Sequence, residues 1–231
     1  MSDITIQGPD GSFGAYLALP ATTPAPGVVV AQEIFGVNQV MRDICDWLAG
    51  AGFVACCPDL FWRIEPGIQL TDKTEAEWQR AFELFNAFDV DKGVVDLQAT
   101  LGHLRGHEAC TGKVGDVGYC LGGKMAFLMA TRTDADCSVS YYGVGLDALV
   151  GEAGNITRPL LLHIAANDRF VPPEAQEKIK TALAGNPNVT IHVYEGQDHA
   201  FARVGGEHYD EAAANLANAR TLDFLKRNLA S

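Results

Sequence analysis

The chain has 231 residues, of which 48% are hydrophobic and 20% charged, an ordinary composition for a globular protein. Its 17 Lys and Arg residues against 29 Asp and Glu residues give a formal net charge of −12. This sign is unfavourable for binding the phosphates of nucleic acids or an anionic membrane surface, so we expect neither partner. The sequence shows no signal peptide and no apolar run of the roughly 18 residues that a membrane span needs.

The cysteine pattern argues against disulfides and zinc. No C-x-x-C pair and no zinc-type Cys/His spacing occurs among the six cysteines, at positions 45, 56, 57, 110, 120 and 137. We therefore expect reduced thiols and a cytoplasmic protein. His103 and His107 have the spacing of one helix face, but Gly106 interrupts that helix and no nearby acid completes a ligand set. No metal site is expected.

Strand and helix patterns alternate along the chain. Residues 4–7 and 15–19 predict an antiparallel strand pair around a Pro-Asp-Gly turn. Apolar runs that are typical of strands buried on both faces follow at residues 28–31, 53–57, 114–119, 139–142, 160–165 and 189–194. Helical periodicity lies between them, at residues 38–49, 75–88, 90–104, 123–131, 173–183 and 209–229.

This alternation predicts an α/β fold with a mostly parallel central sheet and helices on both faces. No linker or repeat divides the chain, so residues 1–231 are expected to form a single domain. The polar stretch at residues 62–73 is expected to be a loop that shapes a site rather than one that hangs free.

Cys120 stands between glycines where a predicted strand meets a predicted helix, in the stretch Gly-Tyr-Cys-Leu-Gly-Gly. This fits the G-x-nucleophile-x-G turn, in which glycines let strand and helix nearly touch and the nucleophile is pushed into a strained, exposed conformation. The helix N-terminus would favour a thiolate, and the N–H of Leu121 would face a developing oxyanion. By itself the pattern is weak, because a free cysteine is often a buried core residue.

Two further residues strengthen the hypothesis of a nucleophile. Asp168 and His199 each follow a predicted strand, so they are expected at the same edge of the sheet as Cys120, in the chain order nucleophile, acid, histidine. A histidine that a carboxylate orients supplies the base that a largely protonated thiol lacks. Asp198 is an alternative acid, but a neighbour in sequence would usually point elsewhere, so a turn role is expected for it.

Other candidates are expected to be structural. His163 and His192 lie within strand-like runs and are expected to be core or flanking histidines. Cys56 and Cys57 are adjacent in a strand without a base in reach, so core packing is expected for both. Glu33 is unusual, because it is a carboxylate at the end of an apolar strand, where an unpaired charge is costly. A structural salt bridge would explain it.

Over nearly its whole length the sequence resembles the dienelactone hydrolase family, the cysteine-dependent members of the α/β-hydrolase superfamily. The segments that carry the resemblance are Gln-Glu-Ile-Phe-Gly-Val-Asn at 32–38, Cys-Pro-Asp-Leu at 57–60, Gly-Tyr-Cys-Leu-Gly-Gly at 118–123, Tyr-Tyr-Gly-Val-Gly at 141–145 and His-Ala-Phe-Ala-Arg at 199–203. The resemblance implies an α/β-hydrolase fold.

The resemblance also implies roles for individual residues. Cys120, His199 and Asp168 would form a catalytic triad, and the backbone N–H groups of Ile34 and Leu121 an oxyanion hole. Glu33 would hold the resting thiol and take its proton when substrate binds. Cys120 would attack a lactone or carboxylic ester, giving an acyl-enzyme that a water activated by His199 hydrolyses. The expected partner is this small molecule, no cofactor is required, and the chain is expected to be a monomer or a weak homo-oligomer.

Substrate binding is where the sequence departs from the family. The family's named substrate is an anionic enol lactone held by two arginines, of which Arg203 matches one. Trp78 stands where the second is expected, Phe82 stands at a nearby tyrosine position, and Arg80 lies about 200° around the helix. Phe35 and Tyr142 complete the expected binding set.

The apolar Trp78 and Phe82 make neutral or aryl esters an alternative substrate class. Two further alternatives are a redox-responsive thiol, which would not explain His199 and Asp168, and a catalytically silent binding module.

Overall fold

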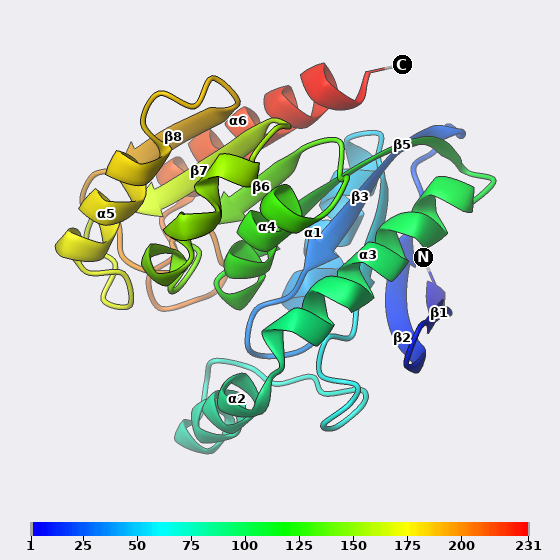
Figure 1. The fold of residues 1–231 in the computed structure, drawn as a ribbon. Coiled ribbons are helices and arrows are strands. Elements are labelled where there is room, and N and C mark those ends of the chain that lie inside the picture. The colour runs from blue at the N-terminus through cyan, green and yellow to red at the C-terminus, as the bar shows by residue number, and fades with distance from the viewer. Residues whose placement is uncertain (1, 231) are drawn as a thin grey trace.

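The structure of the protein is a computed structural model that describes residues 2–230; Met1 and Ser231, the outermost residues of the predicted domain, lie outside this range. Within it, eight strands form one sheet in the order β1-β2-β4-β3-β5-β6-β7-β8 (Figure 1). The strands are β1 (Ser2–Gly8), β2 (Gly11–Ala18), β3 (Ala25–Ala31), β4 (Val54–Pro58), β5 (Cys110–Tyr119), β6 (Ser138–Tyr141), β7 (Leu160–Ala165) and β8 (Val189–Tyr194).

Strand direction divides the sheet into a small antiparallel part and a larger parallel part. β1 pairs with β2, and β2 with β4, in antiparallel register. The neighbouring strands from β4 to β8 all pair in parallel. The predicted antiparallel pair and mostly parallel sheet are therefore confirmed, and the six parallel strands all end at one edge, which we call the carboxyl edge.

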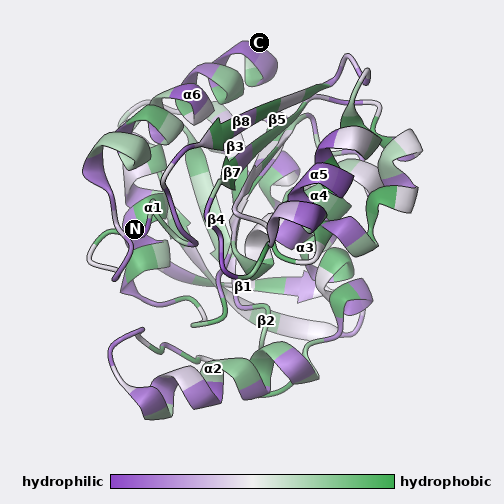
Figure 2. Ribbon diagram, turned by 90° about the vertical axis from the view of Figure 1, so that its left-hand side faces the viewer, coloured by the Kyte–Doolittle hydropathy of each residue, from purple (hydrophilic) through white to green (hydrophobic). Residues whose placement is uncertain are grey.

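Helices cover both faces of the sheet, as predicted. α1 and α6 pack on one face, and α3, α4 and α5 on the other (Figures 1 and 2). α2 lies beyond the end of the sheet, outside both layers (Figure 2). The helices are α1 (Gln39–Gly50), α2 (Glu75–Ala87), α3 (Val90–Gly106), α4 (Leu121–Arg132), α5 (Pro173–Leu183) and α6 (Glu211–Leu229).

Short polar side chains begin four of these helices. The side chain of each capping residue accepts a hydrogen bond from the backbone N–H three residues later, which satisfies one of the donors that a helix start leaves unpaired. The four caps are Asn38, Thr74, Asp89 and Asp210. The core lies around the middle of the sheet, where the side chains of Val28, Val29 and Val30 are completely buried.

Element boundaries differ from the predicted ones mainly at tight turns. α4 begins at Leu121 rather than at residue 123, because the helix starts directly after the sharp turn at Cys120. Two short 3₁₀ helices, Leu146–Ala148 and Val150–Asn155, were not predicted, because segments this short show no periodic sequence pattern. None of the helices in the described part of the chain has both the length and the apolar character needed to cross a membrane.

Candidate active site

Cys120 lies at the carboxyl edge, on the sharp turn between β5 and α4. Its backbone has φ 57° and ψ −112°, a strained conformation for a residue with a side chain. The turn depends on glycines: a Cβ on Gly118 would lie 1.9 Å from the carbonyl oxygen of Gly122, and a Cβ on Gly122 would lie 2.0 Å from that of Ala31. The predicted close approach of strand and helix is therefore present.

Backbone strain in the described residues gathers at this edge. Three non-glycine residues of the range 2–230 have positive φ, namely Cys120, Tyr142 and Ala200. Tyr142 directly follows β6, and Ala200 directly follows His199 in the loop after β8. Such strain persists only where the surrounding structure holds it in place, and it is typical of functional sites.

His199 and Asp168 meet at the same edge. His199 Nδ1 donates a hydrogen bond of 2.8 Å to Asp168 Oδ2, and both side chains are buried. The backbone N–H of Phe170 donates to the other carboxylate oxygen of Asp168 at 2.8 Å, which fixes the carboxylate. The remaining ring nitrogen of His199, Nε2, is buried without a hydrogen-bond partner in residues 2–230. His199 and Cys120 line one cavity, so this nitrogen is available for chemistry there.

The charge state of His199 depends on its two partners. Burial lowers the pKa of His199, but negative charge on Cys120 and the hydrogen bond to Asp168 outweigh burial and raise the pKa to about 10. An imidazolium is therefore favoured at neutral pH.

The two expected oxyanion donors lie next to Cys120 in sequence or in the wall of its cavity. Leu121 is the first residue of α4, so its N–H belongs to the unpaired donors at a helix N-terminus. Ile34 lines the cavity together with Cys120. Neither N–H donates a hydrogen bond to another group in residues 2–230.

Glu33 binds Arg203 in this structure. Arg203 Nε donates to Glu33 Oε2 at 2.8 Å and Arg203 Nη2 to Glu33 Oε1 at 3.0 Å, a bidentate pair with both side chains buried. Burial opposes the positive charge of Arg203, but Glu33 outweighs it and raises the pKa of Arg203. The salt bridge expected as one explanation of Glu33 is present, and no hydrogen bond from the Cys120 thiol to Glu33 is formed in the described chain.

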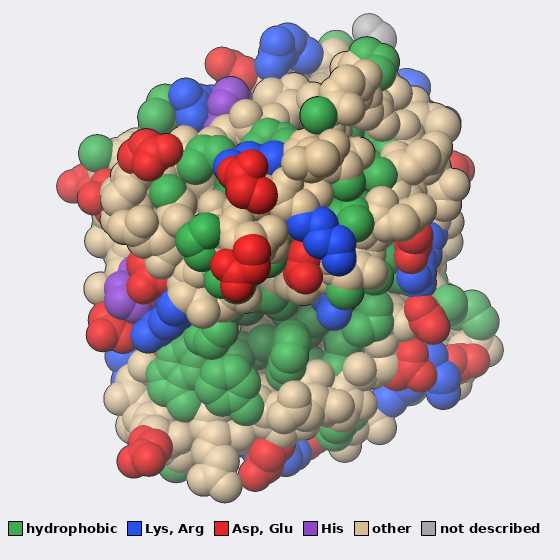
Figure 3. Space-filling view, turned by 60° about the vertical axis from the view of Figure 1, so that its left-hand side comes forward, with side chains coloured by type: hydrophobic (Ala, Val, Ile, Leu, Met, Phe, Trp, Pro, Cys, Tyr) green, Lys and Arg blue, Asp and Glu red, His purple; other side chains and the backbone are tan. Residues whose placement is uncertain are grey.

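The cavity beside Cys120 is lined mostly by apolar and aromatic side chains. Its volume is about 210 Å³. Figure 3 shows a recess lined by hydrophobic side chains with charged groups around its rim. The lining residues are Ile34, Trp78, Phe82, Phe85, Cys120, Val144, Phe170, His199 and Arg203.

Two residues of the expected binding set do not line this cavity. Phe35 is buried behind it, edge-on to the ring of Trp78 and beneath the guanidinium of Arg203, with 5.0 Å between centres in each contact. Tyr142 packs edge-on against His199 with ring centroids 5.1 Å apart. Each is buried one layer beneath the cavity, where it supports a residue that does line it, and its expected part in substrate binding stays a prediction.

Three lining residues were not predicted from the sequence. Phe85 lies three residues after Phe82 on α2, so helical spacing could have found it. Val144 and Phe170 lie in loops, where no periodicity indicates direction. Phe170 also packs edge-on against the ring of His199 with centroids 4.8 Å apart.

Asp198 and His163, which were expected to be structural, make hydrogen bonds that stabilise the fold. Asp198 Oδ1 accepts hydrogen bonds from the backbone N–H groups of His199 and Arg169, which is the turn role expected for it. His163 is buried and hydrogen-bonded to Tyr194 and Thr221. No group of three or more His, Cys, Asp and Glu side chains in the described residues is arranged to hold a metal ion.

The chain is similar to known proteins over nearly its whole length. Residues 13–229 match the dienelactone hydrolase family. The chain is 59% identical to a protein of Azospirillum brasilense, over 99% of this chain and all of that one. It is 44% identical to the carboxymethylenebutenolidase of Pseudomonas putida, over 96% of this chain and 94% of that one.

A solved structure from Klebsiella pneumoniae has the same fold. It aligns with a TM-score of 0.87 at 28% identity and covers 98% of both chains. The chain belongs to the dienelactone hydrolase family and has an α/β-hydrolase fold.

Proposed function

We propose that this protein hydrolyses lactones or carboxylic esters through a Cys120–His199–Asp168 triad and a covalent acyl-enzyme. Family membership supports hydrolysis of ester bonds. The observation that carries the triad is the placement of a strained cysteine and a carboxylate-bound histidine in the wall of one cavity. The proposed reaction has two steps, acylation and deacylation.

In acylation, the Cys120 thiolate attacks the carbonyl carbon and a C–S bond forms. The carbonyl oxygen becomes an oxyanion that the free N–H groups of Ile34 and Leu121 can bind. As the oxyanion collapses, the bond to the alkoxide oxygen breaks. The His199 imidazolium, with its pKa raised to about 10, supplies the proton that the leaving oxygen needs.

Deacylation follows from the same electrostatics. Once the sulfur is part of a thioester, it carries no negative charge, and one of the causes that raise the pKa of His199 is gone. The imidazole can then take a proton from a water that attacks the thioester carbonyl. Asp168 holds Nδ1–H, so that Nε2 faces the water. The tetrahedral intermediate then collapses to the carboxylic acid and the Cys120 thiolate, and His199 is protonated again.

Glu33 is proposed to act at the start of this cycle. Its carboxylate is bound by Arg203, and both residues lie at or beside the cavity. A substrate carboxylate that competes for Arg203 would release Glu33, which could then take the proton of the resting Cys120 thiol, give the thiolate that starts acylation, and return the proton to the sulfur after deacylation.

The substrate proposed first is a lactone related to dienelactone, since relatives such as the Pseudomonas putida protein are named carboxymethylenebutenolidase. The aromatic lining formed by Trp78, Phe82, Phe85 and Phe170 supports neutral aryl esters as a second substrate class.

The test is to measure kcat/KM for cis and trans dienelactone and for a neutral aryl ester, in the wild type and in Cys120→Ala. We expect Cys120→Ala to abolish turnover of every substrate. Mass spectrometry of the wild type after mixing with an activated ester should show the acyl adduct on the peptide that contains Cys120. Turnover that survives in Cys120→Ala would overturn the mechanism.

A further inference from the structure

Arg203 is shared between two carboxylates. Besides the two hydrogen bonds to Glu33, its Nη1 donates to Asp72 Oδ2 at 3.2 Å. Arg203 lines the cavity beside Cys120 and also a second cavity of about 140 Å³, whose wall includes Asp72. Arg203 therefore belongs to the walls of both cavities, and Asp72 lines the second but not the one that holds Cys120.

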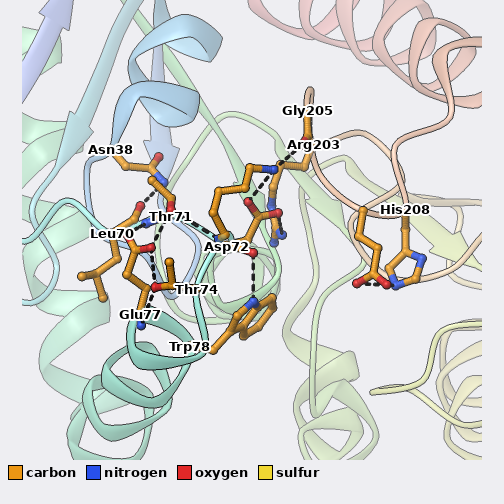
Figure 4. Close-up of polar contacts among 12 residues, drawn as sticks. Asn38, Leu70, Thr71, Asp72, Thr74, Glu77, Trp78, Arg203, Gly205 and His208 are labelled. Carbon is orange, nitrogen blue, oxygen red and sulfur yellow. Dashed lines mark hydrogen bonds and ion pairs between the residues drawn. The ribbon is translucent and has the colours of Figure 1, made fainter.

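The loop that precedes α2 holds Asp72 in this position (Figure 4). The indole Nε1 of Trp78 donates to the backbone oxygen of Asp72 at 3.1 Å. Next to it, Glu77 accepts hydrogen bonds from the N–H and the hydroxyl of Thr71, each at 2.8 Å. Lys73 Nζ contacts the backbone oxygen of Gly205, beside Arg203. Because these contacts fix the backbone on both sides of Asp72, its carboxylate is aimed at Arg203 without much freedom.

The charges around the guanidinium are unequal. The buried cluster contains one cation, Arg203, and two carboxylates, Glu33 and Asp72, whose side chains are 7%, 3% and 9% exposed. Lys73 binds the other oxygen of Asp72 at 3.0 Å, but its side chain is 60% exposed, so water screens its charge. Burial opposes ionisation of Asp72, yet Lys73 and Arg203 together lower its pKa, so Asp72 stays ionised at neutral pH.

We propose that Asp72 is a specificity-determining residue, which acts through Arg203 to disfavour substrates that carry a negative charge. A substrate carboxylate entering the cavity must compete with two protein carboxylates for one guanidinium, whereas a neutral substrate need not. This inference rests on the proposed hydrolysis at Cys120. Asp72 would be the group that sets the preference of this hydrolysis between anionic and neutral substrates.

The experiment compares two esters with the same leaving group, p-nitrophenyl hexanoate and p-nitrophenyl hydrogen adipate, which differ by a terminal carboxylate. Their kcat/KM values are measured in the wild type and in Asp72→Asn, which removes the charge and keeps an oxygen for Arg203. We expect the ratio of adipate to hexanoate turnover to rise about three- to tenfold in Asp72→Asn, since one negative charge near the substrate carboxylate is removed. Raising the salt concentration should bring the ratios of the wild type and Asp72→Asn closer together.

Asp136→Asn is the matched control. Asp136 is similarly buried, its side chain being 10% exposed, and it pairs with Lys113 and Arg158. It lies just before β6, at the edge of the sheet opposite Cys120. The substitution Asp136→Asn changes the net charge by the same amount as Asp72→Asn, and we expect it to leave the ratio of adipate to hexanoate turnover unchanged. Asp72→Ser provides a second removal of the charge and should move the ratio in the same direction as Asp72→Asn.

The outcomes separate the two proposals. A parallel loss of activity on both esters in the Asp72 variants would mean a purely structural role and overturn this inference. If turnover depends on Cys120 but the ratio of adipate to hexanoate turnover is unchanged in the Asp72 variants, this inference is overturned and the proposed function is retained. Absence of Cys120-dependent turnover of both esters in the wild type would overturn the proposed function and this inference together.

Discussion

Two buried histidines, His199 and His163, show how partners decide the behaviour of one residue type. Both side chains are almost completely inaccessible to water. Burial by itself lowers the pKa of each. His163 has hydroxyl partners, with Nδ1 2.7 Å from Tyr194 Oη and Nε2 2.9 Å from Thr221 Oγ1, and its pKa is lowered well below 6.5. At His199, the charge interaction with Cys120 and the hydrogen bond to Asp168 outweigh burial, and the pKa rises to about 10.

This comparison teaches that burial alone does not indicate function. Burial and the positive charges of His192 and Arg220 keep His163 neutral, and its two hydroxyl contacts link β7 to β8 and α6. Anionic partners favour the imidazolium, and one of them can lose its charge during a reaction. Only a histidine of the second kind can change its proton affinity during a catalytic cycle.

The largest effect is expected when Asp168, the partner that orients His199, loses its charge. In Asp168→Asn, we expect kcat for ester hydrolysis to fall by about 10³–10⁴, because the amide cannot hold the required tautomer of the imidazole. The matched control is Asp198→Asn, which changes the carboxylate next to His199 in sequence. Its side chain accepts only backbone hydrogen bonds there, so kcat should change less than about threefold. A larger loss in Asp198→Asn than in Asp168→Asn would assign the acid to Asp198.

The buried pair of Glu33 and Arg203 contains a permanent cation, so removal of its anion should lower stability as well as activity. Glu33→Gln removes the charge that compensates buried Arg203 and keeps one acceptor oxygen. We expect the free energy of unfolding to fall by about 2–3 kcal/mol, measured by urea denaturation. The control Asp91→Asn breaks an exposed pair with Arg132 and should change stability little. Equal effects of the two variants would contradict the importance of burial for this pair.

The electrostatic account of His199 can be tested directly. Replacing the sulfur in Cys120→Ala removes one of the causes that raise the pKa of His199 and leaves the hydrogen bond to Asp168. We expect NMR titration of the imidazole protons to give a pKa of about 10 in the wild type and a clearly lower value in Cys120→Ala. An identical pKa in both proteins would show that no thiolate–imidazolium pair exists.

The smallest expected effect concerns His163 and acid. The unfolded chain binds a proton at His163 near pH 6.5, while the folded chain binds it only at lower pH, so the unfolded state holds more protons below pH 6.5. The free energy of unfolding should therefore fall by up to about 1 kcal/mol between pH 6.5 and 5.5 on account of this group. His163→Gln should flatten this part of the stability profile.

The control for that prediction is His192→Gln. His192 is only partly buried and its pKa is lowered less strongly, so the profile should change less than in His163→Gln. If the two variants gave the same profile, burial of His163 would not be the cause of the acid sensitivity.

Much of the site could be predicted because its residues sit at fixed points of a regular pattern. Cys120, Asp168 and His199 each follow an apolar strand, and parallel strands end at one edge of a sheet, so their meeting could be inferred before any coordinates. The aromatic wall was predicted in part, because Trp78 and Phe82 lie on a helix with readable spacing. Phe170 and Val144 could not be predicted, since loop residues have no period that fixes their direction.

Sequence by itself determined the strand–helix alternation, the glycine turn around Cys120 and the order of nucleophile, acid and histidine, because these depend on local composition and on short spacing. Tertiary structure alone decided which carboxylates bind Arg203. Glu33 and Asp72 lie 170 and 131 residues from it along the chain, and only the packing of three loops brings them within hydrogen-bond distance. The same packing buried Tyr142 and Phe35 one layer beneath the cavity. Charge pairing and burial of this kind depend on distances in space, which local sequence patterns do not encode.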